Sequence, residues 1–331
     1  MTESTGSPLP RRILGRGGPE VSALGYGAMG LSGVYGQADD AQSLRVLHQL
    51  LDRGVNFIDT ADAYGDGHNE RLIAGLLRER RDEVVLATKF GATADTGLGR
   101  PDNVRRSIDA SLGRLGTDHV DLYYLHRLDP TTPIEDTVGA LAELVEQGKI
   151  GHIGLSEISA KTLRRAHAVH PIAAVQQEYS LFTREPEQEL LPALRELGVA
   201  LVAYSPLGRG VLTGAIRDLS DVENLEVRQQ RYPRFAEESL RHNIALTEPL
   251  RARAEQLGRT PAQLALAWLL AQGDDVIPIP GSRRIANIEA NIAAATTPLD
   301  PGLVAELSEL FPSDAAAGER YYPAGMARLD R

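Results

Sequence analysis

Residues 84–125, VVLATKFGATADTGLGRPDNVRRSIDASLGRLGTDHVDLYYL, contain one complete copy of the pattern that decides the fold. The apolar run Val84–Thr88 predicts a strand, and a second apolar run follows at Val120–Leu125. Between them, apolar residues recur at helical spacing over Val104–Leu115, and Gly116 closes that stretch. A strand, a helix and a second strand in this order predict a βαβ unit with parallel strands.

The same alternation extends along the chain from residue 22 onward. Leu44, Leu47 and Leu51 mark a helix that stops at Gly54, and Thr260-Pro261 predicts the start of the seventh helix. Eight strands with intervening helices predict an α/β fold, a (β/α)8 TIM barrel, in preference to an open doubly wound sheet. The predicted strands are Ala23–Gly27, Val55–Ile58, Val84–Thr88, Val120–Leu125, Ile150–Leu155, Ala173–Val175, Val199–Tyr204 and Val276–Ile279.

Two segments do not follow the repeat. Arg11–Leu14 and Glu20–Ser22, joined by a Gly/Pro-rich turn, predict an N-terminal β-hairpin that caps the barrel floor. The stretch from Gly208 to about His242 is charged and poor in apolar periodicity. It predicts a long functional loop between strand seven and helix seven, over the active face.

The composition restricts the class of protein. The 35 Lys and Arg against 45 Asp and Glu give a net charge of −10, which disfavours nucleic acid as a partner. The absence of cysteine excludes disulfides, thiolate nucleophiles and Cys-bound zinc. No signal-like or membrane-spanning stretch occurs, so we expect a cytoplasmic protein without a membrane partner. We expect one domain over residues 1–331, with a flexible tail at 1–10 and a C-terminal tail at 311–331 near the barrel mouth.

The segment Gly25–Gly30 matches the dinucleotide fingerprint GxGxxG. That fingerprint binds a pyrophosphate only where its third glycine opens a helix. Residues 31–38 have a loop-like composition, so no helix is expected to follow. We interpret the motif as a strand end bent by glycines.

Polar residues follow three successive predicted strands. Asp59 ends strand two and Tyr64 lies in the loop after it, Lys89 ends strand three, and His126 ends strand four. Singly, each has a structural explanation as a helix cap, a core aromatic, a solvated strand end or a buried histidine. Because the carboxyl ends of barrel strands share one rim, the four are expected to converge there as a catalytic group.

At this point the sequence resembles the aldo-keto reductase family over nearly its whole length. It looks most like the bacterial, yeast and plant branch with GLSE and EYSL blocks, which includes perakine reductase-like and pyridoxal reductase-like members. The motifs that carry the resemblance are Asn56-Phe57-Ile58-Asp59-Thr60-Ala61 with Tyr64-Gly65, Ala87-Thr88-Lys89, Asp121 to His126, Gly154-Leu155-Ser156, Gln176 to Ser180, Ala203 to Gly208 and Ile279-Pro280-Gly281-Ser282.

The resemblance implies a division of labour among the four rim residues. Tyr64 is implied as the general acid, Lys89 and Asp59 as the groups that tune it, and His126 as the residue that orients the substrate carbonyl. Physical chemistry agrees, because a phenol with a pKa near 10 releases its proton more easily beside an ammonium. A paired carboxylate in turn keeps the ammonium charged.

The resemblance also implies NADP(H) across the barrel mouth, since side chains do not supply hydride. Ser156 and Gln176 match the residues that bind the carboxamide, and Tyr204 matches the aromatic on which the nicotinamide stacks. For Tyr204 and Gln176 alone, a core aromatic and a polar strand end are the simpler explanations. The cofactor-binding residues so implied are Gly27, Met29, Ser156, Gln176, Tyr204, Ser205, Leu207, Gly208, Ser282, Arg283, Asn287 and Asn291.

A helix start after strand eight bears on the choice between NADPH and NADH. Ser282 is predicted as the N-cap of this helix. The free backbone amides of the helix start and the guanidinium of Arg283 are then expected to form a binding site for the 2′-phosphate. The alternative is that Arg283 and Arg284 are solvated charges on an ordinary helix. Two positions depart from many relatives: Glu157 replaces an asparagine, and Asn287 replaces an arginine, which leaves Asn291 for the adenine.

The leading hypothesis is an NADPH-dependent reductase of an aldehyde or ketone. A second is a redox-sensing accessory subunit of a membrane channel, and a third is a cofactor-free barrel isomerase or lyase. No metal is expected, and His167 and His170 are interpreted as surface residues. The sequence does not identify the substrate, because the segments expected to shape the pocket carry no diagnostic signature; they are residues 31–36, 91–100, 208–242 and the tail after Phe311. It does not identify the oligomeric state either, and a homo-oligomer is left open.

Overall fold

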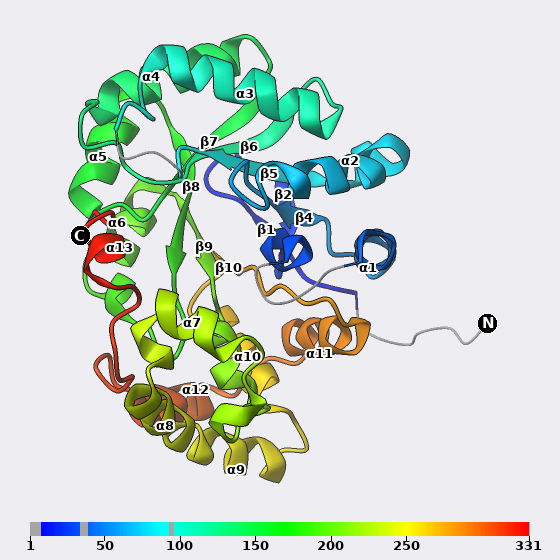
Figure 1. Cartoon of the computed structure of the whole chain (residues 1–331), viewed down its shortest axis with the longest axis vertical. Coiled ribbons are helices and arrows are strands. Elements are labelled where there is room, and N and C mark those ends of the chain that lie inside the picture. The colour runs from blue at the N-terminus through cyan, green and yellow to red at the C-terminus, as the bar shows by residue number, and fades with distance from the viewer. Residues whose placement is uncertain (1–7, 34–38, 93–95, 331) are drawn as a thin grey trace.

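Eight parallel strands form a barrel, and helices surround it (Figure 1). The computed structural model of the chain describes residues 8–33, 39–92 and 96–330. Neighbouring strands pair in sequence order from first to last, and the Gly25 amide donates to the Pro278 carbonyl (2.9 Å) where the two outermost strands meet. The predicted (β/α)8 TIM barrel is therefore confirmed. Its strands are β3 (Tyr26–Gly27), β4 (Phe57–Asp59), β5 (Val85–Phe90), β6 (Val120–Leu125), β7 (Ile150–Ser156), β8 (Ile172–Glu178), β9 (Ala200–Tyr204) and β10 (Val276–Pro278).

One helix follows each barrel strand and packs its apolar face on the sheet. In α3, Val104, Ile108 and Leu115 are buried, and Gly116 ends the helix in the left-handed conformation (φ 65°). Thr260 caps α10, as predicted, because its side chain accepts a hydrogen bond from the Gln263 amide. The barrel helices are α1 (Asp40–Asp52), α2 (His68–Arg80), α3 (Pro101–Leu115), α4 (Ile134–Glu146), α5 (Ala160–Val169), α6 (Leu190–Leu197), α10 (Pro261–Leu270) and α11 (Ile285–Thr296).

The strand register brings the candidate residues to one rim. Gly27 pairs with Asp59, Lys89 pairs with Tyr124, and Ser156 pairs with Gln176. These pairs lie at the carboxyl ends of their strands, where parallel strands of a barrel open on a shared face. The amino acid order of each strand end therefore fixes which side chains meet at the mouth.

The N-terminal hairpin is confirmed. β1 (Arg11–Ile13) pairs antiparallel with β2 (Glu20–Ser22). Leu14 and Val21 are fully buried and pack with residues of the barrel interior, among them Phe57 and Leu122. This contact closes the floor of the barrel with apolar side chains, opposite the rim that holds the candidate site.

The segment between β9 and α10 differs from the predicted loop, because it contains helices. The 3-10 turns Gly208–Thr213 and Leu219–Asp221 come first, and α7 (Leu225–Arg231), the 3-10 turn Pro233–Phe235, α8 (Glu237–Leu246) and α9 (Glu248–Gln256) follow. Buried residues such as Leu240 and Phe235 anchor it, at spacings too irregular to reveal a helix in the sequence. With α12 (Pro301–Leu310), α8 and α9 cover one end of the molecule, and α13 (Pro323–Met326) lies near the C-terminus (Figure 1).

The GxGxxG segment forms a strand end followed by a turn. β3 ends at Gly27, and Ala28–Ser32 forms a single 3-10 helix in place of an α-helix. The sequence predicted no helix here, and the structure has a short 3-10 helix instead. This helix is too short to serve as the helix of a dinucleotide fingerprint.

Parts of five sequence-based expectations lie outside the described residues. They concern positions 1–7 of the N-terminal tail, 34–38 of the loop expected after the GxGxxG segment, 34–36 of the first substrate loop, 93–95 of the second and 331 of the C-terminal tail. No helix within residues 8–33, 39–92 and 96–330 is long and apolar enough to cross a membrane.

Candidate active site

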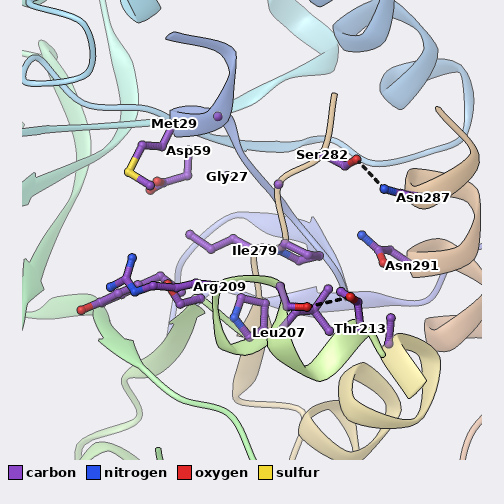
Figure 2. A pocket seen from close by; sticks show the side chains of 18 of the residues that line it. Gly27, Met29, Asp59, Leu207, Arg209, Thr213, Ile279, Ser282, Asn287 and Asn291 are labelled. Carbon is purple, nitrogen blue, oxygen red and sulfur yellow. Dashed lines mark hydrogen bonds between the residues drawn. The ribbon is translucent and has the colours of Figure 1, made fainter. Parts of the chain in front are cut away.

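A cavity opens at the carboxyl rim and brings most of the candidate residues together. Its volume is about 570 Å³, and its lining runs from Tyr64 and His126 at one end to Asn287 and Asn291 at the other. Figure 2 shows Asp59 and Met29 on one side of the cavity and Ser282, Asn287 and Asn291 on the other. The candidate residues in its lining are Gly27, Met29, Asp59, Tyr64, His126, Ser156, Gln176, Tyr204, Ser205, Leu207, Ser282, Arg283, Asn287 and Asn291.

Lys89 lies behind this lining and connects three groups. Its Nζ donates to Asp59 Oδ1 (2.5 Å), to the Thr60 carbonyl (2.7 Å) and to the Tyr64 hydroxyl (3.1 Å). The Lys89 side chain is completely buried, and that of Asp59 is 2% exposed. All three donors of the ammonium are therefore used, and one of them points at the phenol oxygen.

The charges of this group favour a protonated amine beside a protonated phenol. Burial by itself lowers the pKa of Lys89, but the Asp59 carboxylate and the Tyr64 hydroxyl outweigh it, and the pKa stays above its ordinary value. Burial raises the pKa of Tyr64, while the Lys89 charge opposes that rise. Lys89 is thus the main group that makes Tyr64 a stronger acid than its burial alone would allow.

Asp59 is fixed from a second side. Gln176 Nε2 donates to Asp59 Oδ2 (2.8 Å), although the two residues are 117 positions apart. One donor of the Gln176 amide is thereby committed to the protein. Gln176 also lines the cavity, and its role as a cofactor residue stays a prediction.

His126 stands edge-on to Tyr64 in the same end of the cavity. The ring centroids are 6.0 Å apart at an interplanar angle of 84°. Burial, followed by the charge of Arg127, lowers the pKa of His126 well below its ordinary value, so the imidazole is neutral. Its Nδ1 is buried and has no hydrogen-bond partner among the described residues. A neutral imidazole beside a phenol can donate to or accept from a bound ligand.

The helix start after β10 corrects one sequence-based expectation. α11 begins at Ile285 with Arg284 as its N-cap residue, so Ser282 is not the N-cap. Ser282 Oγ instead accepts from the Arg284 amide (3.1 Å) and from Asn287 Nδ2 (3.3 Å), the bond drawn in Figure 2. A two-residue extension separates Ser282 from the helix, and the serine hydroxyl caps this turn.

The remaining groups at this end are more open. Arg283 is 28% exposed in its side chain, and its Nη2 donates to Glu223 Oε2 (3.3 Å) in the segment between β9 and α10. The buried Asn291 amide faces the cavity and makes no hydrogen bond to any described residue. Its donor and acceptor are available to a ligand.

The middle of the cavity is formed by strand ends and their loops. Tyr204 lines it and donates its hydroxyl to Glu157 Oε1 (2.8 Å). Two glycines explain the close approach of the walls, since a Cβ on Gly281 would lie 2.4 Å from the Gly27 carbonyl oxygen. Gly208, expected among the cofactor residues, begins a 3-10 turn and does not line the cavity, whereas Arg209 and Gly210 do.

Glu157, whose role the sequence left open, holds the C-terminal tail. It is completely buried, and its Oε1 accepts from Arg320 (2.9 Å) as well as from Tyr204. Tyr321 follows Arg320, lines the cavity and lies 3.0 Å from the Tyr204 hydroxyl, oxygen to oxygen. The carboxylate therefore joins the tail to the barrel mouth and does not itself face the cavity.

Sequence reasoning missed several residues of this lining. Arg127 and Arg284 directly follow His126 and Arg283, two positions that were selected. The strand-end rule that selected His126 applies equally to Arg127, so that signal was present. Thr213, Glu223 and Tyr232 lie in the segment after β9, where no local pattern distinguishes them.

No group of three His, Asp or Glu side chains suited to a metal occurs in the described part of the chain. His167 accepts a hydrogen bond from the Ile172 amide through Nδ1 (3.2 Å), which gives this histidine a structural partner.

The structure is a (β/α)8 barrel, and its candidate acid–base residues lie together at the carboxyl ends of the strands. The chain belongs to the aldo/keto reductase family, whose sequence model matches residues 23–311. It is therefore an oxidoreductase of a family that uses nicotinamide cofactors.

Two relatives illustrate the similarity. The chain is 44% identical over 332 aligned residues to the probable aldo-keto reductase 1 of Glycine max, with 97% of this chain and 94% of that protein covered. A crystal structure of the thermostable aldo-keto reductase Tm1743, in complex with the inhibitor epalrestat, is 33% identical. It superposes with a TM-score of 0.74 and covers 91% of this chain and 99% of that one.

The residues present fit a nicotinamide dinucleotide. The cavity has an acid–base group at one end, and at the other it has the start of α11 and the Asn291 side chain, for which no hydrogen bond to a described residue is found. When bound, such a cofactor supplies the hydride that no side chain can provide. Ser156, Tyr204, Arg283 and Asn291 are the residues in this chain that would hold it.

Proposed function

We propose that this protein reduces an aldehyde or a ketone to the alcohol with NADPH as the hydride source, and that Tyr64 is the general acid. The observation that carries the proposal is the buried Lys89 ammonium, 3.1 Å from the Tyr64 hydroxyl in the wall of the cavity. The carbonyl carbon receives the hydride, and the carbonyl oxygen receives the Tyr64 proton. Solvent then returns a proton to the phenolate.

The other residues of the group serve this proton transfer. Lys89 stabilises the phenolate that remains, and Asp59 keeps Lys89 charged and in place. His126, neutral and in the cavity lining beside Tyr64, orients the carbonyl by a hydrogen bond. We further assign the chain to the bacterial, yeast and plant branch of the family, a proposal that the soybean relative supports.

The preference for NADPH over NADH rests on the groups that precede α11. Arg283, with the free amides of the first turn of α11, forms a site for the 2′-phosphate of the adenosine. In the structure, Arg283 is paired with Glu223, so phosphate binding would exchange a carboxylate partner for a phosphate partner. A cytoplasmic location, a homo-oligomer and the absence of nucleic-acid and membrane partners stay predictions.

A carbonyl-reduction assay tests the proposal. The purified protein is given 4-nitrobenzaldehyde and a panel of aldehydes and ketones with NADPH or NADH, and cofactor oxidation is followed by absorbance. We expect NADPH-dependent turnover of several aldehydes. Tight NADPH binding without any turnover would favour the redox-sensing accessory subunit. No spectroscopic sign of NADP(H) binding would instead favour a cofactor-free isomerase or lyase.

A further inference from the structure

The catalytic end of the cavity contains an arginine that the proposed reaction does not use. Arg127 follows His126 at the end of β6 and lines the cavity together with Tyr64. Its Nη1 donates to the His126 carbonyl (2.7 Å) and to Ser156 Oγ (3.4 Å). No carboxylate oxygen of the described residues lies within ion-pair distance of its guanidinium.

Burial by itself lowers the pKa of Arg127, but Tyr204, Tyr321 and Glu157 outweigh it at a distance, and the nearby buried carboxylates are already paired with other arginines. Glu178, 3% exposed, pairs with both Arg209 (3.2 Å) and Arg234 (3.0 Å). Glu157, a second buried carboxylate behind the cavity lining, pairs with Arg320 (2.9 Å). Three arginines thus already share two carboxylates.

With Arg127 as a fourth arginine, this wall of the cavity has an excess of positive charge. A largely buried cation without a carboxylate partner is costly unless a ligand supplies the anion. An arginine presents a planar fork of donors that matches the oxygens of a carboxylate or a phosphate.

Arg127 also lies close enough to the acid–base group to act on it electrostatically. Its charge contributes to the lowered pKa of His126 and opposes the rise in the pKa of Tyr64 that burial causes. An anion bound at Arg127 would therefore sit near the group that handles the carbonyl.

We propose that Arg127 is a specificity-determining residue that binds an oxyanion of the substrate, so that the preferred substrates are carbonyl compounds that also carry a carboxylate or a phosphate. This inference rests on the proposed function and names the substrate class of the same site. The charge complementarity between the wall and the ligand carries it.

Three aromatic aldehydes of similar size test the proposal. They are 4-formylbenzoate, 4-formylphenyl phosphate and the neutral methyl 4-formylbenzoate, each reduced with NADPH. For the unaltered protein we expect kcat/KM for at least one anionic aldehyde to exceed that of the ester at least about tenfold, as a charge-assisted contact allows. The ranking of the carboxylate and the phosphate then identifies the oxyanion.

Variants link the preference to Arg127. Arg127→Met should lower kcat/KM for the anionic aldehyde at least about tenfold more than for the ester and so abolish the advantage of the anion. Any loss that acts through Tyr64 and His126 is shared by all three aldehydes, and Arg127→Lys should restore part of the advantage. Arg164→Met, which removes an equal charge from an exposed pair with Glu196, should leave the ranking of the aldehydes unchanged. Thermal unfolding and NADPH titration check that Arg127→Met still folds and binds the cofactor.

Two results would overturn the inference. One is an unaltered protein that reduces the ester as well as it reduces both anions, a result that needs no variant. The other is an Arg127→Met variant that loses activity equally on all three aldehydes. Failure to reduce any of the three, or any aldehyde of the wider panel, would instead contradict the proposed function itself.

Discussion

The two ends of the cavity are built in opposite ways. At the Tyr64 end, the Lys89 ammonium uses all its donors within the protein, and its side chain is completely buried. At the α11 end, Arg283 is partly exposed and Asn291 has no hydrogen-bond partner in the described structure. The comparison indicates that the protein fixes the groups that handle protons in its interior before any ligand arrives. At the α11 end it keeps Arg283 partly exposed in an ion pair with Glu223 and leaves the Asn291 side chain to a ligand.

The largest expected effect lies at the fixed end. Tyr64→Phe removes one hydroxyl and keeps the ring, so the barrel should remain folded and bind its cofactor. A positioned acid contributes about 10² to 10⁴-fold, so kcat for aldehyde reduction should fall at least about a hundredfold while NADPH affinity changes less than about threefold. Single-turnover kinetics and fluorescence titration measure the two quantities. Near-normal reduction by Tyr64→Phe would remove Tyr64 from the mechanism.

A smaller effect is expected at the open end. Arg283→Ala should raise KM for NADPH about tenfold and leave KM for NADH nearly unchanged, since a charge-assisted contact is worth about 1.5–3 kcal/mol. Steady-state kinetics with both cofactors measure this. The neighbouring Arg284→Ala, at an exposed position, serves as the matched control and should have a smaller effect. Equal effects of Arg283→Ala on both cofactors would argue against a 2′-phosphate site.

The smallest expected effects are on the free energy of unfolding, and they allow a direct comparison of the two ends of the cavity. Thr88, next to Lys89, donates to the fully buried Glu70 carboxylate (2.6 Å). Thr88→Val leaves that carboxylate oxygen without its donor and should lower the free energy of unfolding by about 1–3 kcal/mol. Ser282→Ala, at the open end, should change it by less than about 0.5 kcal/mol. Denaturant unfolding measures both variants. Equal losses in the free energy of unfolding would contradict the claim that the Tyr64 end is more tightly fixed than the α11 end.

The barrel could be predicted from local sequence because each strand and helix carries its own signal. The apolar runs ending at Lys89 and His126, and the glycine that stops α3, are readable within a few residues. The segment after β9 could not be predicted in the same way. Its short helices are anchored by single buried residues such as Phe235 and Leu240, which form no repeating pattern.

The site could be predicted only as a set of strand ends. That Asp59, Lys89 and Tyr64 converge follows from barrel geometry, but the bond from Gln176 to Asp59 spans 117 residues and has no sequence signature. The helix start was misplaced because Ser282 is a good N-cap residue, whereas the chain inserts a turn before Ile285. Burial of Glu157 against Arg320 likewise depends on a tail 163 residues away.

The central claim is that a buried ammonium tunes a phenolic acid, and pH profiles of Lys89→Met and the unaltered protein test it most directly. Because burial raises the pKa of Tyr64 above about 10, the reference value of a phenol, carbonyl reduction should hold through neutral pH and decline only at alkaline pH, where the proton is lost. Alcohol oxidation, which needs the phenolate, should rise over the same range.

In Lys89→Met the charge that opposes the raised pKa of Tyr64 is gone, so the alkaline decline of reduction should move to higher pH, and the rate should fall because the phenol is a weaker acid. Reduction and oxidation profiles that fall together, with a midpoint that Lys89→Met does not move, would contradict the account.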